Sequence, residues 1–232
     1  MGTVFKVQEA PTVNVAGTGD SFPVHRIYCV GQNYANHVRE MGANPEREAP
    51  FFFSKPADAV CPEGTQLPYP MATANLHHEV ELIVAVGKNG TNIPASEALD
   101  YVFAYAVGLD LTRRDLQKEA KKKGRPWATA KGFDRSAPCS DLHKVEEVGH
   151  IERGKITLSV NGEIRQQGDI SDMIWSVAEV ISSLSSFFEL CPGDLIFTGT
   201  PTGVGPLECG DILEGEVKNL AKLNITIVRK EN

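Results

Sequence analysis

The sequence has no long apolar run. None of its segments reaches the 18 consecutive apolar residues that mark a membrane-spanning helix, so we expect no membrane partner. The opening MGTVFKVQEAP lacks the apolar core of a secretory signal, and Lys6 stands where a myristoylation signal carries Ser or Thr. These absences lead us to expect a cytoplasmic protein.

Paired cysteines are also missing. The cysteines are odd in number and widely spaced, and no two of them form the Cys-x-x-Cys pair that binds zinc or carries redox chemistry. We therefore expect free thiols in a reducing compartment. The residues concerned are Cys29, Cys61, Cys139, Cys191 and Cys209.

The sequence also lacks an excess of positive charge. Lys and Arg number 23 against 30 Asp and Glu, which gives a formal net charge of −7. The one basic run, Lys121–Lys123 followed by Arg125, is short and suits the C-terminal end of a helix. A nucleic-acid-binding surface needs a broad basic footprint, so we expect no nucleic acid partner.

What is present is typical of a single globular domain built from short strands. The chain has 232 residues, and its 21 Gly and 14 Pro supply many turns. Residues 1–23 show no periodicity and are predicted to form an N-terminal arm, with the domain spanning 24–232. Apolar and β-branched runs predict strands at 26–30, 76–86, 101–109, 155–160, 163–167, 195–198, 212–217 and 223–228.

Turn and cap signals complete this outline. Asn161-Gly162 favours a type I′ hairpin turn between two of the strands. Helices are predicted within 33–42, from a capping box of Thr112 and Asp115 to Gly124, and over 171–189, where apolar residues recur every three or four positions. Many strands and few helices indicate an α+β fold that is β-dominated.

Two carboxylates share one face of the predicted strand 76–86. Side chains alternate along a strand, so Glu79 and Glu81 lie on the same face about 7 Å apart. In so apolar a strand their repulsion and lost hydration favour a neutralising cation, and Asp110, 31 residues after Glu79, can approach as a third ligand. Three carboxylates form a hard oxygen site suited to Mg²⁺, Mn²⁺ or Ca²⁺. The competing interpretation is an exposed edge strand with solvated glutamates.

A histidine and a glutamate lie close together on the first predicted helix. His37 and Glu40 are three residues apart and so share one helical face. A carboxylate against an imidazole raises its basicity, as a water-activating base requires. Such a pair on an exposed helix is more often a surface contact.

Other polar residues could serve the same site. Arg114 and Gln117 share a face of the helix after Asp110 and could receive a substrate carboxylate, although solvent exposure explains them equally well. Lys131 has small and apolar neighbours, where an unpaired ammonium is costly, so it could face an anion. Thr200 offers a hydroxyl in a Gly-rich loop that is either a ligand-binding loop or a structural turn.

Taken together and in order, six segments of the sequence resemble the fumarylacetoacetate hydrolase superfamily. They are GQNYANHVREMG, FFFSKPADAV, LHHEVELIVAVGK, GLDLTRRDLQKEAKKKGRPWATAKGFD, VNGEIRQQGD and GDLIFTGTPTGVG. The single-domain branch of acylpyruvate hydrolases is the most similar. The resemblance implies a roll of stacked β-sheets with few helices, usually assembled as a homodimer.

The resemblance also implies roles for the residues already singled out. The superfamily's Glu-x-Glu pair and later Asp bind Mg²⁺ or Mn²⁺, which assigns Glu79, Glu81 and Asp110; Ca²⁺ can take such a site in a crystal. His37 and Glu40 match the catalytic pair of the family's lid, and Lys131 matches its catalytic, substrate-facing lysine. Thr200, Arg114 and Gln117 match substrate-binding positions.

The implied reaction is hydrolysis of a carbon–carbon bond in an acylpyruvate, such as fumarylpyruvate, to pyruvate and a carboxylic acid. In this hypothesis the metal chelates the 2-oxo acid, and His37, held by Glu40, deprotonates the attacking water. Related members of the superfamily are oxaloacetate decarboxylases and isomerase-decarboxylases, which need no such water. We expect a small 2-oxo acid as the binding partner in each case.

Two readings from other classes stay open at this point. His77 and Glu79 with a distant histidine, either His143 or His150, could form the facial triad of a non-haem iron oxygenase. Both distant histidines lie in a charged stretch that is typical of a surface loop. The other reading is a binding protein that keeps the fold without catalysis.

Overall fold

Two β-sheets form the body of the protein, described by a computed structural model over residues 2–6, 8–35 and 48–229. The larger sheet has eight strands, with β12 (His143–Lys144) paired to β9 beside the main path. Along that path the strands are β4 (Phe51–Lys55), β3 (Arg26–Gly31), β15 (Asp194–Phe197), β8 (Val80–Val86), β9 (Val102–Leu109), β11 (Ala137–Cys139) and β5 (Val60–Pro62).

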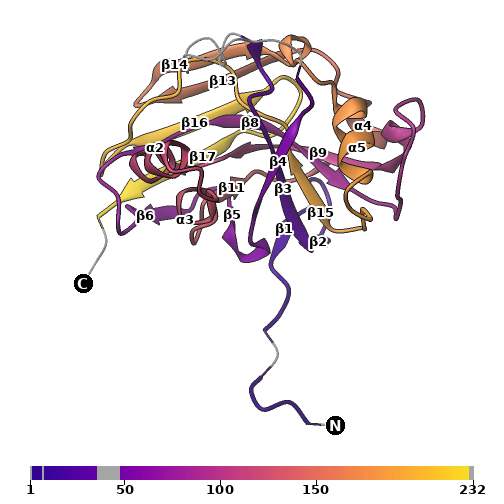
Figure 1. Cartoon of the computed structure of the whole chain (residues 1–232), viewed down its shortest axis with the longest axis horizontal. Helices are drawn as coiled ribbons and strands as arrows, with labels where there is room; N and C mark the ends of the chain where they lie inside the picture. Colours follow the sequence, from indigo (N-terminus) through magenta and orange to yellow (C-terminus); the bar gives the residue numbers. More distant parts are fainter. Residues whose placement is uncertain (1, 7, 36–47, 230–232) are drawn as a thin grey trace.

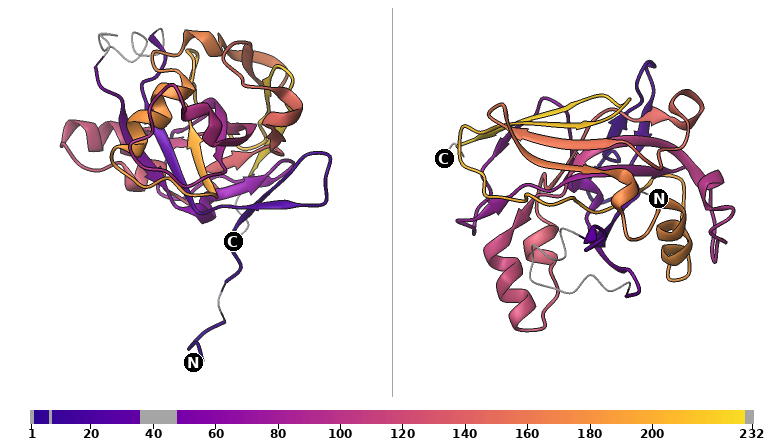
Figure 2. Two further views of the ribbon diagram at one scale, coloured as in Figure 1. Left: turned by 90° about the vertical axis from the view of Figure 1, so that its right-hand side faces the viewer. Right: turned by 90° about the horizontal axis from the view of Figure 1, so that it is seen from above.

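The second sheet has five strands and packs on β8 and β9 of the first (Figures 1 and 2). Its order is β14 (Glu163–Asp169), β13 (Lys155–Val160), β16 (Ile212–Val217), β17 (Leu223–Val228) and β6 (Gln66–Pro68). Two short pairs complete the strands, namely β1 (Thr12–Asn14) with β2 (Ser21–Pro23) and β7 (Leu76–His77) with β10 (Thr112–Arg113).

Short helices cover the ends of the sheets. Helices α2 and α3 lie at one end and α5 lies at the other (Figure 1). The helices are α2 (Arg114–Lys122), α3 (Ala128–Lys131), α4 (Val145–Val148) and α5 (Val177–Ser185), with 3-10 turns η1 (Ala57–Ala59), η2 (Ala98–Tyr101) and η3 (Ile170–Asp172). Strands thus dominate, as the sequence predicted.

Strand β8 explains why the core is divided in two. Leu82 and Val84 face one way into the larger apolar cluster, shared with the five-stranded sheet, and Ile83 and Ala85 face the other way into a second cluster. This is the alternation that strand geometry imposes. Because both faces are buried, a charged side chain on β8 must have a partner or a ligand.

Several predicted elements are confirmed. Strands form at 26–31, 102–109, 194–197, 212–217 and 223–228, close to the predicted bounds. Asn161 and Gly162 have φ values of 54° and 80°, as a type I′ turn requires, and they join β13 to β14. Gly124, with a φ of 60°, follows the end of α2.

The prediction of one continuous strand over 76–86 is wrong. This segment is broken at His78 and Glu79, so that β7 pairs with β10 while β8 pairs with β9 and β15. At the break the Val80 N–H donates to the side chain of Gln166, 3.0 Å away, instead of to a neighbouring strand. At this point a side chain that is distant in the sequence takes the place of the backbone hydrogen bond to a neighbouring strand. A local sequence pattern does not reveal such a contact.

Two predicted helix starts are also wrong. Residues 173–175 lie outside the helix because Met173 bridges Tyr34 and the Ile174 N–H bonds to the Asn33 carbonyl at 2.8 Å. Helix α5 therefore starts only at Val177, after a capping box of Ser176 and Glu179. For α2 there is no capping box.

The side chains predicted to cap α2 bond elsewhere. Thr112 donates to the Asp110 carbonyl at 3.0 Å. Asp115 accepts from the Thr73 hydroxyl at 2.6 Å and from the Ala74 N–H at 3.1 Å. Both residues therefore fix the loop around the helix start, and Arg113 stands at the N-cap without a side-chain cap bond.

The predicted N-terminal arm contains structure that the sequence did not indicate. Strands β1 and β2 form a hairpin within it, and Val13, Val15 and Phe22 are buried in the second apolar cluster. The boundary at residue 23 stays a prediction. Among the described residues, no helix combines the length and apolar composition that a membrane crossing requires.

Candidate active site

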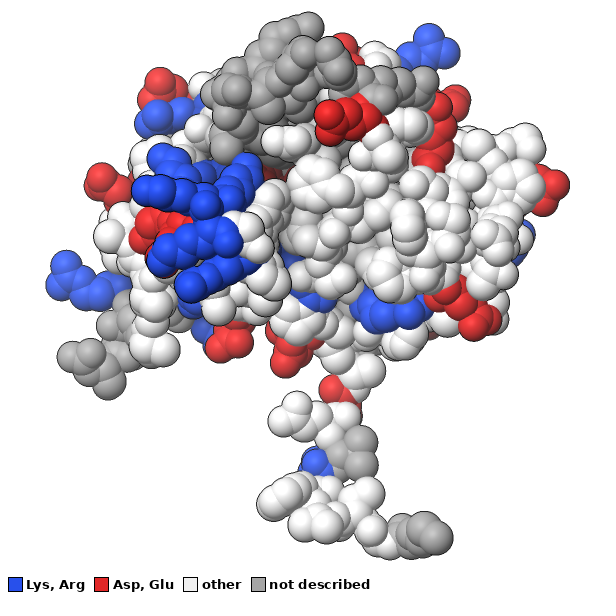
Figure 3. All heavy atoms as spheres, in the orientation of Figure 1, with Lys and Arg blue, Asp and Glu red and all other residues white. Residues whose placement is uncertain are grey.

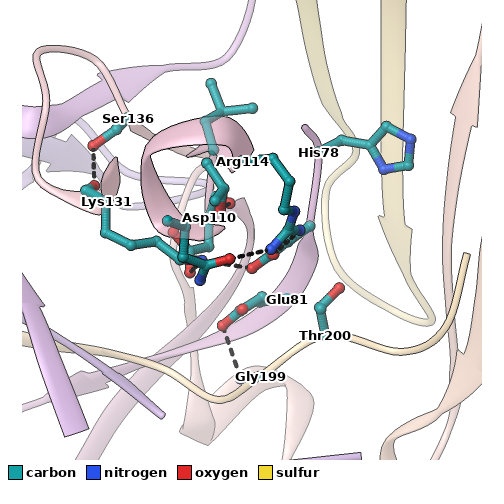
Figure 4. Close-up of polar contacts among 12 residues, drawn as sticks. His78, Glu81, Asp110, Arg114, Lys131, Ser136, Gly199 and Thr200 are labelled. Carbon is teal, nitrogen blue, oxygen red and sulfur yellow. Dashed lines mark hydrogen bonds and ion pairs between the residues drawn. The ribbon is translucent and has the colours of Figure 1, made fainter. Parts of the chain in front are cut away.

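A pocket of about 400 Å³, counting space open to solvent, lies where β8 and β9 meet α2 and α3. Its lining combines acids, bases and rings. They are Glu79, Glu81 and Asp110, then Arg114, Gln117, Lys121 and Lys131, then Phe51, Phe53 and Trp127, with Gly199 and Thr200 on the opposite side. Figure 4 shows Glu81, Asp110, Arg114 and Lys131 converging from separate segments of the chain.

Three carboxylates meet at the base of this pocket. Glu81 is in β8 opposite Gly108, and Asp110 follows β9, where its N–H donates to the Glu79 carbonyl at 2.8 Å. Each acid offers an oxygen within 4.8 Å of the others, and all three are buried, with at most 5% of each residue exposed. So dense a negative cluster inside a protein needs positive charge nearby.

Buried cations supply part of that charge. Lys131 Nζ donates to Glu79 Oε2 at 2.7 Å and to Asp110 Oδ2 at 2.5 Å. Arg114 Nη2 donates to Glu79 Oε1 at 2.5 Å and Arg114 Nη1 to Gln117 Oε1 at 2.5 Å. Burial alone would lower the pKa of Lys131, but the charges of Asp110 and Glu79 outweigh burial and raise it. Lys131 therefore stays protonated.

Lys55 is a further buried cation that the sequence interpretation missed. Its Nζ lies 2.8 Å from Asp110 Oδ1, while its N–H groups donate to the carbonyls of Leu111, at 3.2 Å, and Lys131. Apart from this ion pair, Asp110 Oδ1 has no hydrogen-bond partner within the described residues, so it keeps a lone pair for another ligand. The available signal was a lone lysine closing the apolar run Phe51–Phe53.

Glu81 differs from its two neighbours. Its Oε2 accepts the Gly199 N–H at 2.8 Å, and no ion pair to it is found in the described parts of the chain. Burial, followed by the charges of Asp110 and Glu79, raises the pKa of Glu81 well above its usual range. An uncompensated buried carboxylate beside an open Asp110 oxygen fits a bound divalent cation of the oxygen-preferring kind.

A neutral hydrogen-bond network supports the opposite wall. Gln166 Oε1 accepts from the Val80 N–H at 3.0 Å, and Gln166 Nε2 donates to the Pro201 carbonyl at 2.9 Å. Because one backbone partner can only donate and the other can only accept, these contacts fix which end of the amide is oxygen. Gln166 is fully buried, so the orientation is held.

The fixed amide determines the proton positions of two more side chains. Gln166 Nε2 lies 2.8 Å from Thr200 Oγ1, which must accept, so the Thr200 proton is left to donate elsewhere. Gln166 Oε1 lies 2.9 Å from His78 Nδ1, which must carry the hydrogen. Burial is the main reason that the pKa of His78 is lowered, so this ring is neutral. The sequence interpretation missed both His78 and Gln166.

The structure brings together most of the residues singled out from the sequence. Glu79, Glu81, Asp110, Arg114, Gln117, Lys131 and Thr200 all line one pocket. His37 and Glu40 lie outside the described residues, so their role stays a prediction.

The histidines of the oxygenase reading lie elsewhere. His143 Nε2 accepts the Ala221 N–H at 2.8 Å, His150 contacts the Tyr105 hydroxyl, and His77 bonds to Asn75. Among the described residues the acidic cluster includes no histidine.

Comparisons with known proteins agree with this geometry. The family model "Fumarylacetoacetate (FAA) hydrolase C-terminal" matches residues 26–228. A human protein named oxaloacetate tautomerase FAHD1, mitochondrial, is 45% identical over 205 residues, which are 88% of this chain and 92% of the human protein. A fumarylpyruvate hydrolase from Ralstonia sp is 41% identical over 180 residues, 78% of this chain and 93% of that protein.

A solved structure extends the similarity to the whole fold. The crystal structure of fumarylpyruvate hydrolase from Pseudomonas aeruginosa, in complex with Mn²⁺ and pyruvate, superposes with a TM-score of 0.96 at 51% sequence identity. The match covers 99% of this chain and 100% of that one.

Proposed function

Because this chain belongs to the fumarylacetoacetate hydrolase family, we propose that it is a metal-dependent hydrolase that cleaves the carbon–carbon bond of an acylpyruvate such as fumarylpyruvate. The observation that carries the proposal is the cluster of three buried carboxylates, one of them without an ion-pair partner in the described chain, beside a protonated lysine and a hydroxyl. Similarity to the Mn²⁺ and pyruvate complex supports the same chemistry.

In this proposal Glu79, Glu81 and Asp110 hold Mg²⁺ or Mn²⁺. Three carboxylates match the ligand preference of both ions, and the relative solved with Mn²⁺ supports the choice. When bound, such a cation supplies a Lewis acid that holds the 2-oxo acid end of the substrate and withdraws electrons from it.

The remaining residues orient the substrate and manage charge. Thr200 is the donor that Gln166 leaves free, and it would bind a substrate oxygen together with Arg114 and Gln117. Lys131 Nζ, which keeps its proton, would stabilise the negative charge that develops on the pyruvate half as the bond breaks. Preorganised donors of this kind often contribute the largest share of catalysis.

Water completes the reaction. His37, oriented by Glu40, is the predicted base that takes a proton from water, whose oxygen adds to the distal carbonyl carbon. The carbon–carbon bond then breaks, its electron pair moves to the pyruvate half, and that half takes up a proton. The products are pyruvate and the carboxylic acid of the acyl half.

An ultraviolet assay tests the proposal. Fumarylpyruvate, maleylpyruvate, acetylpyruvate and oxaloacetate are each followed with Mn²⁺, with Mg²⁺ and with EDTA, and pyruvate is quantified in parallel. We expect metal-dependent loss of an acylpyruvate with one pyruvate formed per molecule consumed. Absence of pyruvate from every acylpyruvate would refute the hydrolase.

Oxaloacetate tautomerisation is the second candidate, favoured by the human relative at 45% identity. Moving a proton between carbon and oxygen of a 2-oxo acid needs the acidic site and Lys131 but no attacking water. The variant His37→Ala distinguishes the two activities. It should abolish hydrolysis, whereas tautomerisation that does not use this base should continue. Release of carbon dioxide from oxaloacetate would instead indicate the decarboxylase alternative.

We also propose a homodimer. Aromatic residues on one surface support it, because Phe187 and Phe188 are 68% and 42% exposed, and Phe187 packs edge-on against Phe52 with the ring centroids 6.2 Å apart. Light scattering coupled to gel filtration should give twice the chain mass of 25.2 kDa. A single-chain mass at micromolar concentration would rule the dimer out.

A further inference from the structure

Helix α2 turns three polar side chains toward the pocket. Arg114, Gln117 and Lys121 are spaced by three and then four residues, so they follow one face of the helix. Arg114 and Gln117 bond to each other, and Arg114 also bonds to Glu79. Lys121 is one turn further along the helix and has no role in the mechanism described above.

Lys121 lies against an aromatic wall. Its Nζ is 5.0 Å from the centroid of the Trp127 ring. The Trp127 ring in turn meets Phe51 and Phe53, with centroid separations of 5.5 and 5.6 Å. An ammonium over an aromatic face is held in place while its remaining donors stay available.

The charge of Lys121 is not matched by an acid in the described parts of the chain. Lys123, two residues on, pairs with Glu119 at 2.6 Å, whereas no ion pair to Lys121 is found there. Lys121 is exposed overall, but desolvation of the part beside Trp127 and then the positive charge of Arg114 lower its pKa, while the charge of Glu79 opposes them. Lys and Arg side chains gather over α2 (Figure 3), so the entrance beside it attracts anions.

We propose that Lys121 binds a second carboxylate at the far end of the substrate and so makes the enzyme selective for acylpyruvates that are acids at both ends. The inference rests on the proposed function, which places the 2-oxo acid end at the cation that Glu79, Glu81 and Asp110 would hold, beside Lys131. A flat unsaturated linker then lies along the rings of Phe51 and Trp127. Its terminal carboxylate reaches the ammonium.

The first test measures KM and kcat for Lys121→Gln with saturating Mn²⁺ on fumarylpyruvate, which has two carboxylates, and on acetylpyruvate, which has one. A charge-assisted hydrogen bond is lost only with the first substrate, so its KM should rise about tenfold while kcat is unchanged. The KM for acetylpyruvate should stay constant. Lys121→Arg should restore most of the affinity.

The matched control is Lys122→Gln. This neighbour is on the same helix but is not among the residues that line the pocket, so both KM values should equal those of the wild type. If Lys121→Gln changes both substrates equally, or neither, the specificity role is wrong.

A binding experiment keeps the inference separate from the reaction. The Mn²⁺-loaded protein is titrated calorimetrically with 2-oxoheptanedioate and with 2-oxoheptanoate, which differ only in the terminal carboxylate. Lys121→Gln should weaken the diacid about tenfold and leave the monoacid unchanged. If this binding result were obtained but no acylpyruvate were turned over, the proposed hydrolase function would be wrong and the carboxylate site would still stand. If the wild-type protein bound both acids with equal affinity, the carboxylate site would be wrong.

Discussion

The pocket has a charged half and a neutral half, and the two are built on different principles. The charged half consists of Glu79, Glu81, Asp110, Lys131 and Arg114 in the lining, with Lys55 behind Asp110. The neutral half consists of Thr200 in the lining, with Gln166 behind it and His78 bonded to Gln166. Both are buried. In the first, opposite charges within hydrogen-bond distance compensate one another at every member except Glu81. In the second, two backbone groups fix the orientation of the Gln166 amide, and that orientation sets the hydrogen positions on His78 and Thr200.

The difference predicts how each half responds to substitution. Coulomb interactions in a poorly polarisable interior are strong, so loss of one charged partner should affect both stability and metal affinity. Neutral hydrogen bonds contribute less to stability but set direction, so their loss should appear mainly in substrate affinity.

The largest expected effect comes from two of the proposed metal ligands in the charged half. Asp110→Asn and Glu81→Gln should each abolish Mn²⁺ binding in calorimetry and lower kcat/KM about 1,000-fold or more, since a bound cation contributes several kcal/mol. Their stabilities in EDTA should differ. Asp110→Asn leaves Lys55 without its carboxylate partner and Lys131 with Glu79 alone, and should cost about 3 to 5 kcal/mol.

Glu81→Gln is the matched control for that cost. Glu81 has no cation partner among the described residues, and a glutamine oxygen can still accept the Gly199 N–H. Urea unfolding in EDTA should therefore give a free energy equal to or above that of the wild type. An equal loss of stability in both variants would contradict the charge pattern described for this half.

A substitution of Lys55 tests whether the charged half extends beyond the residues that line the pocket. Lys55→Met removes the ammonium beside Asp110 and the donor to the Leu111 carbonyl, while the Lys131 carbonyl keeps the Ser136 hydroxyl as a donor; the loss should cost about 3 kcal/mol in urea unfolding. The exposed Lys88→Met is the control and should change stability by less than about 0.5 kcal/mol. Equal stability of the two variants would remove Lys55 from the charged half.

The sequence predicted the charged half far better than the neutral half, for a physical reason. Acids within an apolar run such as Val80–Val86 are costly unless a cation is near, so their presence alone indicates a site. Gln166 and Thr200 are ordinary residues of a strand and a loop, and His78 is 88 residues from the Gln166 that it contacts. Only the packing of one sheet on the other brings them together.

The fold was likewise predictable where it depends on local sequence patterns and unpredictable where it depends on contacts between distant residues. Alternation and turn residues act locally, so the hairpin at Asn161-Gly162 and most strands were found. The break at His78 and the late start of α5 depend on distant partners, namely Gln166 and Asn33. A local pattern contains no information about either contact.

Gln166 tests the neutral half directly. In Gln166→Glu one carboxylate oxygen can still accept from Val80 and His78. The other oxygen must accept from Thr200 instead of donating to it, and it loses the bond to the Pro201 carbonyl, which can only accept. The Thr200 proton then turns away from the pocket, and KM for the 2-oxo acid should rise about tenfold to a hundredfold with a smaller change in kcat.

Two further variants separate this reversal from an added negative charge. Gln167→Glu adds the same charge at the exposed neighbouring position and should leave KM unchanged. Thr200→Val removes the hydroxyl and should raise KM to a similar extent as Gln166→Glu. A double variant no worse than either single one would show that Gln166 acts through Thr200.

Substitution of His78 should give the smallest effect, a change in the stability of the fold that is seen only when the pH is varied. Its folded pKa is below the ordinary value near 6.5, so the unfolded chain binds the proton more readily, and the His78 contribution to stability falls as pH drops below about 6.5, by at most about 1.4 kcal/mol per pH unit. His78→Asn places an amide N–H near the position of Nδ1, which keeps the bond to Gln166 but cannot titrate. In urea unfolding between pH 7.5 and 5, this variant should therefore lose less stability than the wild type. Identical losses would mean that His78 takes up a proton as readily in the folded protein as in the unfolded chain, which would contradict the lowered pKa of this buried ring.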